Sequence, residues 1–293
     1  MNNKESTPVN AKTVTACIDG SNSSPLVCDY AAWASLRLDA PLVFLHVLDA
    51  AGGAVETDLS GNIGLGSREH LLQELSELDA KRARLLREQG QHMLRAAIER
   101  AQADGVIAPQ ARQRHGNLVD TLRDSESEIR LLVIGRQGVD GDAVGDHVGT
   151  HLESVIRTMH RPVLVTAGSF RQPRSVMLAF DNGPSTRKGI EMIAGSPLFK
   201  GLPIHLLMVG ADTKDAWESL NHAKSSLEQS GFTVHASIRA GEVEKVLLDY
   251  EEEQDIDLIV MGAYGHSRIR QFFVGSTTTN ILARTKRPLL LLR

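Results

Sequence analysis

Near the C-terminus, three glycines and a serine are spaced as in a loop that can hold phosphate groups. Gly262, Gly265, Gly275 and Ser276 follow the pattern G-x2-G-x9-G-S. A glycine lets a ligand come close to the backbone or gives the chain a positive φ. The segment from Gly275 is expected to begin a helix, whose first turn offers free N–H groups and a partial positive charge to a phosphate. The pattern predicts a phosphate-binding loop at this point in the chain.

Hydroxyl and carboxylate groups are expected at the same end of the predicted sheet. Ser276, Thr277 and Thr278 would each bring a hydroxyl to the start of the helix, although Ser and Thr also begin helices simply as capping residues. Asp181 follows the apolar run SVMLAF, and Met261 lies in the apolar run LIVMG. Ligands of open parallel sheets bind beyond the carboxyl ends of the strands, where the strand order reverses. We therefore expect these groups to surround one ligand.

The elements that must position this site occur twice along the chain. A strand leads into Asp19 in the first half and into Asp181 in the second, and another strand ends 28 residues later in both halves, at Val47 and Val209. The runs LLVIG and LIVMG follow, and each half closes with Arg-Pro and an apolar strand. Continuous Val/Ile/Leu runs separated by helical segments indicate a parallel sheet covered on both faces. The fold class expected is α/β, with two tandem doubly wound, five-stranded, Rossmann-like domains.

A chain of 293 residues has room for two such domains. We expect a disordered tail over residues 1–11, an N-terminal domain over 12–168 and a C-terminal domain over 174–293. A short polar linker separates the domains.

The first half contains an insertion over residues 50–104. A glycine-rich stretch leads into a helix that is expected from about Ser67 to Asp104, with a kink at Gly90. Its leucines recur at helical spacing. That apolar face would either pack on its own sheet or contact a partner subunit.

On these residues the chain resembles the universal stress protein family. G-x2-G-x9-G-(S/T) is the ATP-binding signature of that family, and tandem members are known. The resemblance implies the strand order 3-2-1-4-5 in each half, with the last strands pairing across a two-fold axis into an internal pseudo-dimer. It also implies that Asp181 and the backbone at Val209 hold the nucleoside of ATP, while the glycines and hydroxyls hold its phosphates. Mg2+ is expected only together with those phosphates.

The first half shares this frame but has a different loop. Its weaker candidates for nucleotide binding are Asp19, Val47, Gly135, Gly138, Gly149 and Thr150. Ten residues, not nine, separate Gly138 from Gly149, and Leu152 stands where the second half has Thr278. Residues 139–148 contain three aspartates and no Lys or Arg, whereas residues 266–274 contain Arg268 and Arg270 and no acid. Carboxylates repel a triphosphate unless a metal intervenes, so we expect the first half to bind nucleotide weakly or not at all.

Composition argues against several classes of partner. A net charge of −4 and 4% aromatic residues do not favour nucleic-acid binding. No apolar run approaches the roughly 18 residues that a membrane span needs, and MNNKESTPVNAK lacks the apolar core of a signal peptide. We expect a cytoplasmic protein in which Cys17 and Cys28 are reduced core residues.

Dedicated catalysis is not expected, and slow ATP hydrolysis is the most that the sequence leaves open. The chain has no P-loop, His-Glu-x2-His or Gly-x-Ser-x-Gly motif. An adenylating enzyme of the PP-loop type is a weaker reading, because the Ser-Gly-Gly-x-Asp-Ser loop is absent after Asp19 and Asp181. Two functions remain: a stress-response module that binds ATP in its second half, or a nucleotide-independent interaction module that works through the helix at 67–104. A homodimer and an unidentified protein partner are open in both.

Overall fold

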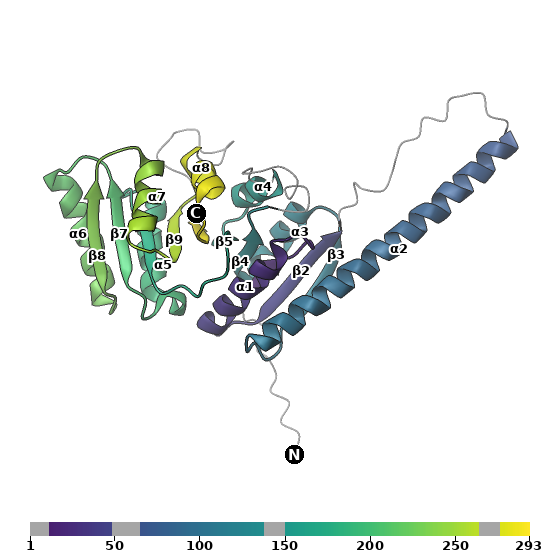
Figure 1. The fold of residues 1–293 in the computed structure, drawn as a ribbon, viewed down its shortest axis with the longest axis horizontal. Helices are drawn as coiled ribbons and strands as arrows, with labels where there is room; N and C mark the ends of the chain where they lie inside the picture. Colours follow the sequence, from purple (N-terminus) through teal and green to yellow (C-terminus); the bar gives the residue numbers. More distant parts are fainter. Residues whose placement is uncertain (1–11, 49–64, 138–149, 264–275) are drawn as a thin grey trace, which may run out of the picture.

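The structure, a computed structural model, describes residues 12–48, 65–137, 150–263 and 276–293, and its helices cover both faces of one sheet (Figure 1). The expected tail over residues 1–11 lies outside these ranges. In order, the first half contains β1 (Thr13–Cys17), α1 (Ser24–Leu38), β2 (Leu42–Leu48), α2 (Leu65–Ala103), β3 (Gln110–His115), α3 (Leu118–Ser125), β4 (Ile129–Gly135), α4 (Thr150–Thr158) and β5 (Val163–Thr166). The second half contains β6 (Val176–Ala179), α5 (Pro184–Gly195), β7 (Ile204–Val209), α6 (Lys214–Gln229), β8 (Val234–Arg239), α7 (Val243–Glu253), β9 (Leu258–Gly262), α8 (Ser276–Arg284) and β10 (Leu289–Leu292).

All of these strands belong to a single ten-stranded sheet. Their order is β3-β2-β1-β4-β5-β10-β9-β6-β7-β8, which is the order 3-2-1-4-5 in the first half and its reverse in the second. Strands within each half are parallel. The halves join where β5 and β10 run antiparallel, with Leu164 opposite Leu290. The predicted fold class is confirmed.

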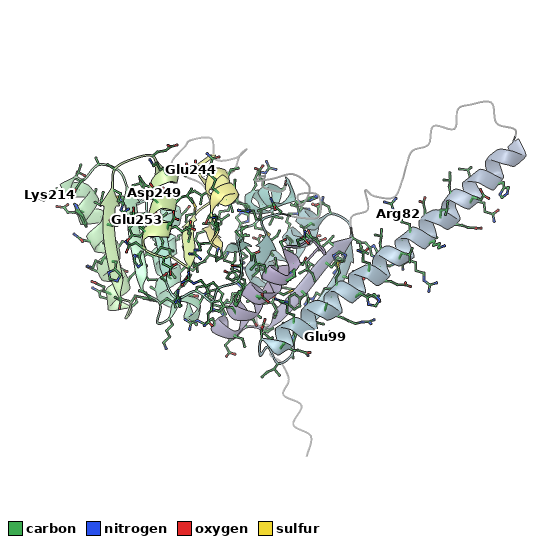
Figure 2. The ribbon with its side chains drawn as sticks, viewed as in Figure 1. Arg82, Glu99, Lys214, Glu244, Asp249 and Glu253 are labelled. Carbon is green, nitrogen blue, oxygen red and sulfur yellow. The ribbon has the colours of Figure 1, made fainter. Side chains whose placement is uncertain are left out.

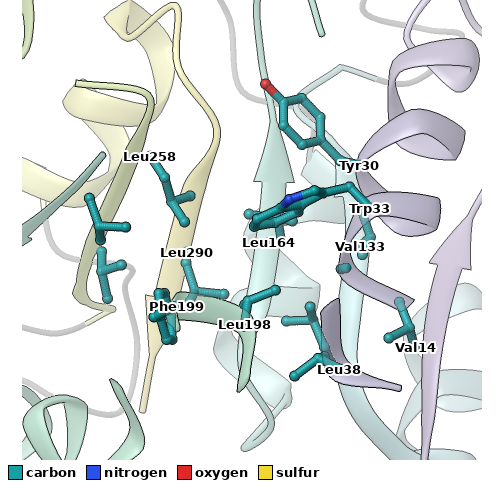
Figure 3. Close-up of a cluster of buried hydrophobic side chains, with 14 of the residues drawn as sticks. Val14, Tyr30, Trp33, Leu38, Val133, Leu164, Leu198, Phe199, Leu258 and Leu290 are labelled. Carbon is teal, nitrogen blue, oxygen red and sulfur yellow. The ribbon is translucent and has the colours of Figure 1, made fainter. Parts of the chain in front are cut away.

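The core forms two apolar layers, one on each face of this sheet. Buried side chains of α1, α2, α5 and α6 cover one face, and those of α3, α4, α7 and α8 cover the other. The first layer crosses the junction without a break: Figure 3 shows Trp33 and Leu38 of the first half in one cluster with Leu198, Phe199 and Leu290 of the second. Burial of this apolar surface holds the two halves together as one body.

Arginines from each half also bind the end of a helix in the other half. Nη1 of Arg136 donates to the carbonyl oxygens of Leu282, Ala283 and Thr285, at 3.3, 3.2 and 2.9 Å, where α8 ends. Nη1 of Arg293 donates to the carbonyl oxygens of Arg157 and Met159, at 2.6 and 3.2 Å, where α4 ends. The last carbonyls of a helix lack partners within the helix and carry partial negative charge, so a guanidinium there is favourable.

The segment between β5 and β6 is fixed by ion pairs. Nη2 of Arg171 lies 2.6 Å from Oδ2 of Asp255, and Nε of Arg171 lies 2.9 Å from Oδ1 of Asp257. The hydroxyl of Tyr30 donates to the carbonyl oxygen of Arg171 at 3.4 Å. The hydrogen bond from Arg171 lowers the pKa of Asp255, whereas burial raises the pKa of Asp257. The predicted linker therefore has a defined path over the second half.

Helix α2 is much longer than its counterpart, with 39 residues against 16 in α6. Only its C-terminal part packs on the sheet, where Leu94, Ala97 and Ala101 are buried. The helix is unbroken at Gly90 and straight along its length (Figure 1), so the kink expected there is wrong. Gly90 instead allows close packing, because a Cβ at this position would overlap the Gln113 amide and lie 2.6 Å from Cδ2 of His46.

Among the described helices, α2 included, none combines the length and the apolar character needed to cross a lipid bilayer.

We predict that Gly90→Ala destabilises the protein although alanine is the better helix former. Helix propensity alone would add about 0.5–1 kcal/mol to the free energy of unfolding. The His46 ring cannot move aside, because it is buried and its Nδ1 lies 2.9 Å from the carbonyl oxygen of Ile18. We expect overpacking to cost about 1–3 kcal/mol, measured by urea unfolding.

Gly195→Ala is the matched control, since a Cβ there meets no described atom within 4 Å. That variant should be as stable as the wild type or slightly more stable. If the free energy of unfolding rises equally in Gly90→Ala and Gly195→Ala, Gly90 is not a packing contact.

Candidate functional site

The candidate site lies where three neighbouring strands of the second half end. β6 is the middle strand, with Ala179 beside Leu207 of β7 and Leu178 beside Val260 of β9. The chain leaves β6 toward β7 on one side and returns as β9 on the other. This is the reversal of strand order at which open α/β sheets bind ligands.

Most of the predicted site residues described in the structure sit at these strand ends. Asp181 follows β6, Val209 is the last residue of β7, and Gly262 is the last residue of β9. Met261 is buried beside Gly262, whereas Val209 and Gly262 are half-buried. Gly265 and Gly275 fall outside the described residues, so the structure brings together the strand-end part of the predicted site.

A tight turn holds the Asp181 carboxylate. Its Oδ1 accepts hydrogen bonds from the N–H of Gly183 and from the hydroxyl of Thr186, both at 2.8 Å. Asn182, between Asp181 and Gly183, has a φ of +57°, and a Cβ on Gly183 would lie 2.9 Å from Oδ1 of Asp181. The carboxylate is thereby fixed at the start of α5, facing the positive end of that helix.

The first half builds the same turn around Asp19. Its Oδ1 accepts from the N–H of Ser21 at 3.0 Å and from the hydroxyl of Ser24 at 3.3 Å. The sequence analysis missed these partners. A visible signal was the shared spacing, with a small residue two positions after each aspartate and a hydroxyl five positions after it.

The start of α8 contributes less to a phosphate site than the sequence suggested. α8 begins at Ser276, whose side chain lies outside the described residues, and Thr277 is half-buried. Thr278 is only 2% exposed, and its hydroxyl donates to the carbonyl oxygen of Ala263 at 3.3 Å. That hydroxyl therefore ties α8 to the end of β9 and is not turned toward a ligand. A phosphate contact from the Thr278 side chain does not fit this arrangement.

Leu152, the counterpart of Thr278, is likewise buried in the core. The exchange of Thr278 for Leu152 between the halves therefore changes a buried contact. It cannot serve as evidence that the first half lost a phosphate ligand.

Other contacts do set the first half apart. The hydroxyl of Ser23 donates to the carbonyl oxygen of Gln137 at 2.8 Å, and a Cβ on Gly135 would lie 2.5 Å from that hydroxyl. A Cβ on Gly20 would overlap Sδ of Met93 from α2. Met93 of the long helix thus contacts the strand-end turn of the first half, although Asp19 and Gly20 remain exposed.

The remaining first-half candidates are only partly described. Val47 is half-buried at the end of β2, and Thr150 begins α4, with its side chain outside the described residues. Gly138 and Gly149 lie in the range 138–149, outside the described residues, as do the aspartates of that loop and Arg268 and Arg270 of the other. In the ranges that the structure covers, no three His, Cys, Asp or Glu side chains lie together as a metal site would require.

The fold and the strand-end site define a tandem α/β protein with a candidate ligand site at a switch point in the sheet. The model of the universal stress protein family matches residues 10–167 and 196–293, so the chain belongs to this family. It is 35% identical to universal stress protein Slr1230 from Synechocystis sp. over 286 residues, which cover 96% of this chain and all of that protein.

Solved structures agree with this fold. The crystal structure of a universal stress protein from Archaeoglobus fulgidus DSM 4304 superposes with a TM-score of 0.64 over 96% of both chains, at 19% identity. The functionally unknown protein PA1789 from Pseudomonas aeruginosa PAO1 gives a TM-score of 0.59 at 15% identity, over 96% of this chain and 92% of that one. At these identities the likeness concerns the fold alone.

We predict that Asp181→Ala lowers the free energy of unfolding by about 1–2 kcal/mol, because the Gly183 N–H and the Thr186 hydroxyl lose their shared acceptor. Asp181→Asn keeps an oxygen at this position and should lie within about 0.5 kcal/mol of the wild type. Chemical denaturation of the three proteins makes the comparison. If Asp181→Asn lowers the free energy of unfolding as much as Asp181→Ala does, the negative charge of Asp181, and not its role as a hydrogen-bond acceptor in the turn, stabilises the protein.

Proposed function

We propose that this universal stress protein binds ATP in its second half and acts as a nucleotide-dependent regulatory module in the cytoplasm. The observation that carries the proposal is the fixed Asp181 carboxylate at the end of the middle one of three strands, whose neighbour β9 ends at Gly262. A carboxylate is a strong acceptor for the hydroxyl and amino groups of a nucleoside.

The residues at the strand ends would hold the nucleoside, and those at the start of α8 would hold the phosphates. Asp181 and the backbone at Val209 and Met261 would contact the nucleoside. Gly262, Gly265 and Gly275 would let backbone N–H groups reach the phosphates, with Ser276 and Thr277 at the N-terminus of α8. Mg2+ would enter with the phosphates, whose charge it would neutralise.

The charges of the two loops favour nucleotide binding in the second half over the first. Arg268 and Arg270 are the only charged residues between Gly265 and Gly275, whereas the first-half loop carries three aspartates. In addition, Met93 of α2 contacts the first-half turn at Gly20, a contact that the second half lacks among its described residues. Structures of two other family members were determined with cAMP and with dAMP, but they superpose at TM-scores of 0.36 and 0.33 and identify only what those proteins bind.

A nucleotide-independent interaction module is the second candidate function. The observation that favours it is the row of exposed leucines on α2, which the nucleotide site does not use. Mass spectrometry of nucleotide released by heat from the purified protein separates the two candidates. Adenine nucleotide in the released fraction supports the first, and none after incubation with ATP and Mg2+ supports the second.

We predict one ATP site per chain. Isothermal titration of the full chain with ATP and Mg2+ should give a stoichiometry near one, because only the second-half loop combines basic residues with the nine-residue spacing. Removal of Mg2+ with a chelator should weaken binding without abolishing it, since the backbone donors remain. Two equal sites per chain would overturn the assignment of the first half as the weaker site.

We predict that Gly275→Val abolishes ATP binding and leaves the unfolding midpoint within a few degrees of the wild type. The added side chain would block the approach of phosphate to the backbone. Gly149→Val makes the same change in the first-half loop and serves as the matched control, with ATP affinity expected to stay unchanged. Unchanged affinity in Gly275→Val would refute the proposed phosphate site.

A further inference from the structure

The N-terminal part of α2 extends away from the body of the protein (Figure 1), and Figure 2 shows Arg82 on this extension and Glu99 on the part that lies along the body. Residues 72–89 are exposed without interruption, and burial begins at Gly90. Five leucines of this segment have between 39% and 62% of their surface exposed: Leu72, Leu75, Leu78, Leu85 and Leu86. Exposed leucines gathered on one segment are a feature of interaction sites.

These leucines share one side of the helix. At about 100° per residue they fall within an arc of roughly 140°. Only two charged residues lie inside that arc, Asp79 and Arg82, and they have opposite signs. We call this side of residues 72–89 the leucine stripe.

The charges around the stripe are divided by sign along the helix. Residues 72–79 contain Glu74, Glu77 and Asp79 and no Lys or Arg, whereas residues 81–87 contain four basic residues and no carboxylate. Glu88, which follows, is paired within the helix, its Oε1 lying 2.9 Å from Nε of Arg84. If two copies of the segment lie antiparallel about residues 80–81, the acidic stretch of each faces the basic stretch of the other. In a parallel pair, like charges would face each other, which is destabilising. The segment is therefore complementary to itself in one direction only.

We propose that the leucine stripe pairs antiparallel with the leucine stripe of a second copy of this chain and forms a homodimer. In this pairing Leu75 of one copy faces Leu86 of the other, and Leu72 and Leu85 lie within about one helical turn of that contact. Asp79 of each copy faces Arg82 of the other. Two-fold symmetry repeats both contacts, as a closed dimer requires.

The sheet junction cannot provide this dimer contact. The edge of β5 is already paired with β10 of the same chain, so a second copy must bind elsewhere. The stripe spans 18 residues, or roughly 27 Å of helix, and the seam between two such segments is short. We therefore expect a dissociation constant on the order of micromolar.

Sedimentation velocity of the full chain between about 1 and about 200 µM tests the proposal. The wild type should shift from monomer to dimer over this range. A Leu75→Lys, Leu86→Lys double variant should weaken the dimer at least about tenfold, which corresponds to about 1.4 kcal/mol. Ile107→Lys is the matched control, because Ile107 is 95% exposed but lies outside the stripe; it should dimerise like the wild type. A wild type that stays monomeric, or a double variant that still dimerises, overturns the proposal.

Charge reversal tests the direction of pairing. Asp79→Arg and Arg82→Asp should each weaken the dimer, because both Asp79–Arg82 pairs become repulsive, and the variant with both changes should restore it. In a parallel dimer the single changes would add no new repulsion. Circular dichroism and thermal unfolding should be unchanged in all three, since these side chains are exposed.

Cysteine cross-linking gives an independent readout of the register. A mixture of Leu75→Cys and Leu86→Cys chains should form an intermolecular disulfide under mild oxidation, whereas Leu75→Cys alone should not. The native thiols should not compete, because burial raises the pKa of Cys17 and of Cys28 to about 12. Efficient cross-linking of Leu75→Cys with itself would contradict the antiparallel arrangement.

Discussion

The antiparallel pairing of β5 with β10 is the contact on which the rest of the structure depends. It joins two similar halves into one sheet, so that one apolar layer on each face runs across both. Hydrogen bonding at this junction also removes the two strand edges that would otherwise be open to other chains. The remaining edges, β3 and β8, are the outermost strands.

Because the two halves belong to one chain, their sequences and contacts can differ. The turns at Asp19 and Asp181 are the same in their hydrogen bonds, which shows that the frame is shared. The contacts above the turns are not shared, because Met93 of α2 reaches the first turn. In the first half an inserted element thus contacts the strand-end turn, while the second half has the shorter α6.

The tandem repeat and the strand-end aspartates could be predicted because the same intervals occur twice in the sequence, whereas the strand order was implied by the resemblance to the universal stress protein family. The role of Thr278 could not be predicted, since a threonine at a helix start looks the same whether its hydroxyl turns outward or toward β9. The extent of packing on α2 was predictable in principle from lengths alone. A helix of 39 residues is about 58 Å long, whereas β2 has seven residues and spans about 23 Å, so more than half of the helix must extend past the sheet.

The cap that Arg136 places on α8 has a mechanical consequence. α8 is nine residues long, a rod of about 13 Å. Its first residue directly follows the glycine loop, and its last carbonyls are held by a guanidinium that belongs to the other half. Arg136 itself comes directly after Gly135, at the strand end of the first half. A displacement of α8 along its axis must therefore either move that strand end or break three hydrogen bonds, so the rod links the two loops of the chain.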